Sequence, residues 1–384
     1  MSVRPPRHPC SIPRNTNASL VANQSKAKMF PLSDCVAFAN HQRQWVLPVT
    51  YDPLFLYATI FASQAALGFG SSTDTNGSTA SQYFGKTVKM LRHRLEQDDH
   101  TMATSDNTLI VIVVLAMAAL MTRQEETARS HLAGIKRIME MRGGFASFDK
   151  AVKLLIEVMR CDIGVALSTG LPPLFFHRPF SGPHESRPPS CSRSDDNNDF
   201  ESLLPTLDSS LGHIWGSLRD FCKTINTAAK THRRLSEQAF LDNMASNVYP
   251  LLNLCFVSGT VSETCRLALL AFCSNAFLQW QGLNLTYNSL PSLYRQSLLG
   301  LVKSSDAVPP RVMLWSLMIG GIALFTCADD RAWHLPWLQE TIGECDAGDW
   351  EGVKDIMKTF SWVDYIHDGP GGRLYSAATL LDVQ

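Results

Sequence analysis

Neither sign of charge is in excess in this sequence. Its 384 residues include 34 lysines and arginines and 35 aspartates and glutamates, which gives a formal net charge of −1. A chain without net charge is not attracted as a whole to nucleic acid or to an anionic membrane, so any such contact would have to be local. Apolar residues make up 45% and charged residues 18%, which indicates a folded protein with a large core.

Closely spaced cysteine pairs are absent as well. The ten cysteines include no C-x-x-C pair, and the two nearest, Cys265 and Cys273, are eight positions apart. The sequence therefore offers none of the common zinc-binding spacings. Several cysteines lie in apolar stretches, where a free thiol packs as a small hydrophobe. The pattern favours reduced thiols over a disulfide framework.

No apolar run is as long as the roughly 20 residues that a membrane-spanning helix needs. The two longest runs cover residues 109–121 and 312–327, and the second contains Gly320 and Gly321. We expect both to be buried core helices and expect no contact with a membrane.

Acidic residues are missing from the first 33 positions, which carry five basic residues and prolines at positions 5, 6, 9 and 13. These prolines exclude a helix, so residues 1–33 are expected to form a disordered basic arm. The same prolines count against an amphipathic transit peptide, and no secretory signal is visible.

Strand signals are scarce, because no alternating apolar run reaches five residues without a better helical interpretation. Asp52 and Pro53 form an N-cap and first-turn pair, and residues 105–121 are apolar on every side, as in the middle of a bundle. Residues 177–200 are rich in proline, serine and charge and indicate a loop insertion. We expect one all-α domain over residues 34–384, a multi-helix antiparallel array of about ten helices.

The usual catalytic motifs are also missing. The sequence contains no G-x-S-x-G turn, no G-K-[ST] phosphate loop and no H-E-x-x-H helix, so we predict no catalytic, cofactor-binding or metal-binding residues. The cluster at 98–100 indicates a solvated helix end rather than an acid–base pair. The stretch KTHRR at 230–234 suits a helix C-terminus by its charge and is too short for a nuclear signal or a phosphate site.

The segment RSHLAGIKRIMEMRGG, residues 129–144, has the apolar spacing of an amphipathic helix. Gly143 and Gly144 are expected to end this helix, because glycine takes the left-handed conformation at little cost. Gly134 lowers helix stability by roughly 1 kcal/mol relative to alanine. We therefore expect a close helix crossing at Gly134, with residues 105–121 as the partner.

His131 opens this segment and is expected to be a hydrogen-bonded packing residue rather than a ligand. The pattern H-L-x-G-I-x-R-x-x-E-x-R-G-G that follows from it resembles the signature helix of the fungal-specific transcription-factor regulatory domain, which usually accompanies a zinc binuclear-cluster module. The resemblance implies a structural role for the residues that carry the pattern: His131, Gly134, Arg142, Gly143 and Gly144.

Further segments resemble the same family in the same order. They are WVLPVTYDPLFLYATIFASQAAL (45–67), RHRL (92–95), MRCDIGVALSTGLPPLF (159–175) and FSWVDYIHDGPGGRLY (360–375). Each is degenerate alone, but five segments in the expected order make chance an inadequate explanation. The resemblance implies a helical regulatory domain in the nucleus that controls transcription, with a metabolic or secondary-metabolite gene set as the target.

The family's DNA-binding module needs six cysteines to hold two zinc ions, and ahead of the helical region this sequence offers only Cys10 and Cys35. The resemblance therefore implies contact with DNA only indirectly or through a zinc-cluster module that is not seen here. The implied partners are other transcription factors or co-regulators, together with a small-molecule effector that shifts the domain between states.

Two alternatives remain open at this point. The chain could be an adaptor or dominant-negative partner of such a factor, reaching promoters through another protein. It could instead be a helical small-molecule-binding protein or an enzyme unrelated to transcription, since apolar helices can enclose a hydrophobic pocket. The absence of a recognisable nucleophile, metal set or phosphate loop counts against an enzyme.

Overall fold

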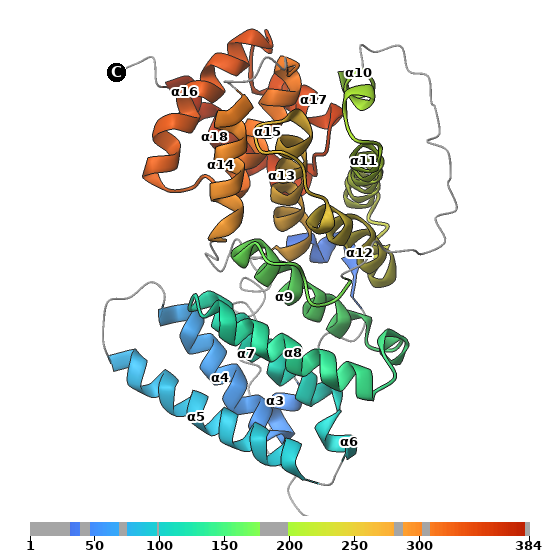
Figure 1. Cartoon of the computed structure of the whole chain (residues 1–384), viewed down its shortest axis with the longest axis vertical. Coiled ribbons are helices and arrows are strands. Elements are labelled where there is room, and N and C mark those ends of the chain that lie inside the picture. Colours follow the sequence, from blue (N-terminus) through green and yellow to red (C-terminus); the bar gives the residue numbers. More distant parts are fainter. Residues whose placement is uncertain are drawn as a thin grey trace, which may run out of the picture.

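The helices of this chain form two groups on either side of one central helix (Figure 1). The computed structural model describes residues 31–38, 47–68, 75–97, 100–176, 199–279, 287–301 and 308–380. Most of the expected basic arm (1–33) and of the expected insertion (177–200) lies outside the described residues.

The first group lies at the bottom of Figure 1 and is built around α7. Nearly all apolar residues of α7 are buried, as its sequence predicts. The side chain of Ser105 caps α7 by accepting the amide of Thr108. The group contains α3 (Pro48–Tyr51), α4 (Pro53–Gly68), α5 (Thr75–Glu96), α6 (His100–Ala103), α7 (Asp106–Met121) and α8 (Glu125–Met141).

Helix α9 (Val152–Thr169) lies between the two groups and contacts α7 and α8 on one side and α12 and α14 on the other. Every residue from Val152 to Ser168 is buried. Gly170 ends the helix in the left-handed conformation, with a φ of 71°. Because α9 has no solvent-exposed face, all of its charged residues must find partners inside the protein.

The second group fills the top of Figure 1. The rings of Trp215, Trp315 and Phe360 pack against one another in its core, with centres 4.8 to 6.0 Å apart and tilted planes. A π-helical turn, η4 (Ser274–Leu278), extends α13. The group contains α10 (Asp199–Leu203), α11 (Ser209–Thr231), α12 (Glu237–Asn253), α13 (Val261–Cys273), α14 (Ser289–Leu301), α15 (Pro310–Ala323), α16 (Ala328–Glu344), α17 (Trp350–Thr359) and α18 (Asp364–Thr379).

Short elements complete the described part of the chain. The 3₁₀ turns are η1 (Pro31–Asp34), η2 (Phe145–Phe148) and η3 (Leu204–Thr206), and β1 (Val36–Ala37) pairs in parallel with β2 (Leu235–Ser236). The all-α prediction is confirmed. The expected number of about ten helices is too low, because one-turn helices such as α3 and α6 have no apolar periodicity to reveal them. The antiparallel order of neighbours stays a prediction.

Two stretches, His100–Met121 and Val261–Leu278, are long and apolar enough to cross a membrane by length and composition. The body of the protein buries 67% of the first apolar window and 89% of the second. Such burial is typical of core helices, and it agrees with the expectation for residues 109–121.

Candidate functional site

The signature segment forms α8, and the face that packs inward is the one its spacing predicts. Its buried residues are Ala128, Leu132, Ile135, Ile138 and Met139, and α8 contacts α7 and α9. Glu125 and Glu126 lie in the first turn, where acidic side chains favour the helix dipole.

Gly143 and Gly144 turn the chain at the end of α8. Their φ angles are 94° and 85°, in the region that side chains with a Cβ rarely enter. The amide of Gly144 donates to the carbonyl of Met139 at 2.9 Å, and the amide of Gly143 donates to the carbonyl of Glu140 at 3.1 Å. The two glycines therefore satisfy the last carbonyls of the helix.

Arg142 joins the end of α8 to the start of α7. Its Nη2 lies 2.8 Å from the Oδ1 of Asp106, and its guanidinium carbon lies 4.5 Å from the centre of the Phe148 ring in η2. A planar guanidinium can make both contacts at once. The Arg-Gly-Gly end of the segment is therefore a structural joint between three elements.

The close crossing expected at Gly134 is wrong. A Cβ placed on Gly134 would meet no other atom within 4 Å, so none of the described helices approaches α8 closely at this position. His131 is partly buried, which lowers its pKa, but its buried Nε2 has no hydrogen-bond partner among the described residues. It is therefore a packing residue, and the expected hydrogen bond is not made by Nε2 within the described part of the chain.

Two other family-like segments, 45–67 and 92–95, contact each other where α4 and α5 pack together. Asp52 caps α4 by accepting the amide of Leu54 at 3.1 Å and that of Phe55 at 3.4 Å. Arg94, from the RHRL segment, contacts the same carboxylate. Burial raises the pKa of Asp52, but the hydrogen bond and charge of Arg94, together with the amides of Phe55 and Leu54, outweigh this and hold the pKa below its usual value.

In a third family-like segment, 159–175, the side chain of Asp162 binds the loop that follows α9. The carboxylate accepts the amides of Leu174 at 2.7 Å and Phe175 at 3.1 Å, and the hydroxyl of Tyr249 from α12 at 3.1 Å. Burial raises the pKa of Asp162 to about 6 although these hydrogen bonds oppose the rise. Lys136 of α8 donates to the carbonyl of Leu174 at 3.0 Å and so ties the signature helix to the same loop.

Three charged side chains in the first half of α9 were not singled out from the sequence. Lys153, Glu157 and Arg160 are each at most 2% exposed. Glu157 Oε1 accepts from Lys153 Nζ and, at 2.8 Å, from Arg160 Nη1. The spacing of four and three positions on one helix face was the available signal.

This charged row connects α9 to the second group of helices. Arg160 Nε donates to the carbonyl of Phe277, in the π-helical turn, at 2.7 Å. Burial lowers the pKa of Lys153 to about 8, although the neighbouring carboxylate of Glu157 raises it. Glu157 Oε1 is therefore the acceptor that Lys153 and Arg160 share inside the protein.

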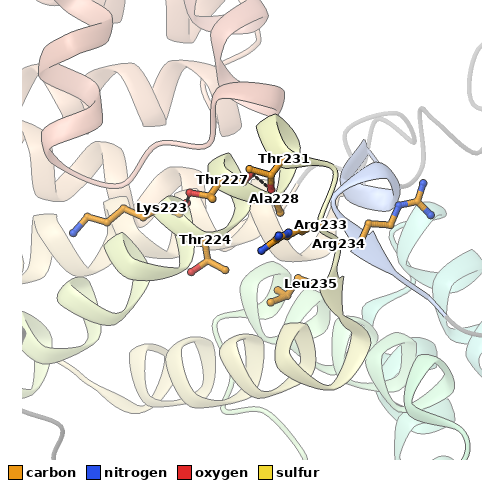
Figure 2. A pocket seen from close by; sticks show the side chains of 8 residues that line it. All are labelled: Lys223, Thr224, Thr227, Ala228, Thr231, Arg233, Arg234 and Leu235. Carbon is orange, nitrogen blue, oxygen red and sulfur yellow. Dashed lines mark hydrogen bonds between the residues drawn. The ribbon is translucent and has the colours of Figure 1, made fainter.

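No group of three or more histidine, cysteine or acidic residues that could hold a metal ion occurs in the described residues. A hollow of about 390 Å³ lies beside the C-terminal end of α11 (Figure 2). It is lined by Lys223, Thr224, Thr227, Ala228, Thr231, Arg233, Arg234 and Leu235. The basic stretch 230–234, which we interpreted as a helix end from the sequence, therefore also forms one side of a surface hollow.

The comparisons with curated proteins and with solved structures found no match. The family model described as fungal specific transcription factor domain matches residues 23–246, more than half of the 384 residues. The matched region contains the Asp52–Arg94 contact, the signature helix and the Asp162 loop, whereas the segment 360–375 lies beyond it. The chain therefore belongs to the fungal-specific transcription factor domain family.

Proposed function

We propose that this chain acts in the nucleus as a transcriptional regulator that controls a metabolic gene set. The family match over residues 23–246 carries this proposal. The geometry agrees with it, because the family-like segments build joints between helices: Arg142 with Asp106, Arg94 with Asp52, and Asp162 with its own exit loop.

Two buried groups with shifted pKa values, Lys153 and Asp162, also favour a regulator over an enzyme. Lys153 and Asp162 are buried and bound to structural partners. A catalytic acid or base must reach a substrate, and neither group borders the hollow beside α11. We therefore propose a non-enzymatic role in which the helical body presents a surface to co-regulators.

A reporter assay tests the proposal without assuming how the chain reaches DNA. Residues 1–384 are fused to a foreign DNA-binding module whose operator controls a reporter gene. We expect reporter expression to change several-fold relative to the module alone, upward for an activator and downward for a repressor. An unchanged reporter, with the fusion present in the nucleus at the level of the module, would contradict the proposal.

The route to DNA distinguishes a direct regulator from an adaptor. The printed sequence has two cysteines ahead of α3, and two thiolates cannot form the six-thiolate zinc cluster of the family. In the adaptor form, these 384 residues would reach a promoter through another protein. Chromatin immunoprecipitation should then depend on a partner factor, and specific binding of the purified chain to naked promoter DNA at moderate salt would reject the adaptor form.

A further inference from the structure

On one wall of the hollow beside α11, the threonine hydroxyls already donate hydrogen bonds within the helix. The Oγ1 atoms of Thr224, Thr227 and Thr231 donate to the carbonyls four residues earlier, at 2.9, 2.7 and 2.8 Å. These hydroxyls can accept a further hydrogen bond but have no proton left to donate. Their methyl groups, Ala228 and Leu235 supply apolar surface. This wall suits an apolar body, with or without hydroxyl groups.

Three cationic side chains line the hollow, and two of them already have partners within the protein. Lys223 Nζ lies 3.3 Å from Asp220 Oδ1, so its charge already has a partner. Arg234 Nε donates to the carbonyl of Asp34 at 3.2 Å, and Figure 2 shows its side chain turned away from the hollow. Both cations are therefore engaged by the protein itself.

Arg233 is the cation that points between the helix and Leu235 in Figure 2. Within the part of the chain that the structure describes, it makes no hydrogen bond or ion pair. Its backbone is held in place, because the amide of Leu235 donates to the carbonyl of Cys35 at 2.8 Å and β2 pairs with β1. A guanidinium on an anchored backbone beside an apolar wall is a receptor for a planar anion such as a carboxylate.

We propose that this hollow binds a small organic acid whose carboxylate pairs with Arg233 and whose apolar body lies against Ala228, Leu235 and the threonine methyl groups. The volume of about 390 Å³ lies within the range of small-molecule sites, roughly 300 to 1,000 Å³. One available guanidinium matches one carboxylate, whereas an acidic peptide would need several cations along a groove. The inference concerns binding alone and does not depend on the role in transcription.

Calorimetric titration of the purified full-length chain tests the proposal with octanoate as the probe. Octan-1-ol provides the same apolar body without the charge, and inorganic phosphate provides charge without the body. We expect octanoate to bind more tightly than either compound. A Kd for octanoate weaker than about 1 mM, or one no tighter than that of octan-1-ol, would overturn the proposal.

Two variants locate the site. Arg233→Gln should weaken octanoate binding about tenfold and leave octan-1-ol binding unchanged. Arg92→Gln removes the same charge from an exposed position on α5, in the other group of helices, and should leave the octanoate Kd unchanged. Equal Kd values for the two variants would refute the site.

Filling the hollow provides an independent measurement. Thr227 is exposed on α11, so Thr227→Trp should preserve the circular dichroism spectrum while reducing the binding of both octanoate and octan-1-ol. Undiminished octanoate binding by this variant would contradict the placement. Binding of a hexaglutamate peptide that depends on Arg233, without octanoate binding, would assign the surface to a protein partner and overturn the proposal.

Discussion

Arg94 holds the carboxylate of Asp52 at two points, with Nη2 2.7 Å from Oδ1 and Nη1 3.0 Å from Oδ2. The two side chains are only 13% and 5% exposed. Asp52 also accepts two amides at the start of α4. One carboxylate therefore caps α4 and binds α5 across a separation of 42 positions in the sequence.

A double-mutant cycle with Asp52→Ala and Arg94→Ala should give a coupling free energy of about 1 to 3 kcal/mol in chemical unfolding. The pKa of Asp52 is below its usual value, so the pair contributes fully above pH about 4, and its contribution is lost as the pH falls through the lowered pKa. The matched cycle of Asp52→Ala with Arg92→Ala should show no coupling. A coupling that does not weaken in acid would contradict the ion pair.

The glycines of α8 should respond to alanine with opposite signs. Gly144 has a φ of 85° and a ψ of −158°, which is essentially restricted to glycine, so Gly144→Ala should destabilise the fold by about 1 to 3 kcal/mol. Gly134 lies inside the helix with free space around it, so Gly134→Ala should stabilise by up to about 1 kcal/mol. Thermal unfolding of the two variants measures both changes in stability. Destabilisation by Gly134→Ala would mean that another helix does pack closely against this position.

Features of this fold that depend on nearby residues could be predicted from the sequence. The cap at Asp52, the inward face of α8 and the turn at Gly143 and Gly144 each depend on residues within a few positions, whose helical geometry is known in advance. The close crossing predicted at Gly134 was wrong, because it rested on the assumption that a glycine inside a helix is kept to let another helix approach. Its low propensity is instead tolerated at a position where nothing packs closely.

The interior partners of α9 could not be predicted in this way. Arg160 donates to a carbonyl 117 positions away and Asp162 accepts from a hydroxyl 87 positions away. No local periodicity encodes such distances, because they depend on how the second group of helices docks on α9. The sequence shows that Lys153, Glu157 and Arg160 share a helix face, but it does not show that this face is buried.

Removing the central charge of this buried row should be costly. Glu157→Gln leaves Lys153 and Arg160 without their shared carboxylate in the interior, and we expect it to destabilise the fold by about 3 to 5 kcal/mol. Urea unfolding measures this change. The matched control is Asp220→Asn, which breaks the exposed pair with Lys223 and should change stability by less than about 1 kcal/mol. Similar losses for the two variants would mean that the buried row is not held by Glu157.

Asp162 should give the protein a pH dependence opposite to that of Asp52. Its pKa is raised by burial to about 6, so between its usual value near 4 and about 6 the folded state binds more protons than the unfolded state. Stability contributed by this group therefore falls as the pH rises through that window and becomes constant above it. A shift of this size corresponds to about 3 kcal/mol.

Asp162→Asn removes this ionisation while keeping one carbonyl oxygen to accept the amide of Leu174. The free-energy difference between the variant and the original chain, measured by urea unfolding at a series of pH values, should move in favour of the variant from pH about 4 to about 6 and then stay constant. Taking the difference cancels the other titrating groups, including Asp52, because they are common to both proteins. A difference independent of pH would mean that Asp162 ionises in the folded protein as readily as in the unfolded chain. The hydrogen bonds from Leu174, Phe175 and Tyr249 would then compensate fully for its burial.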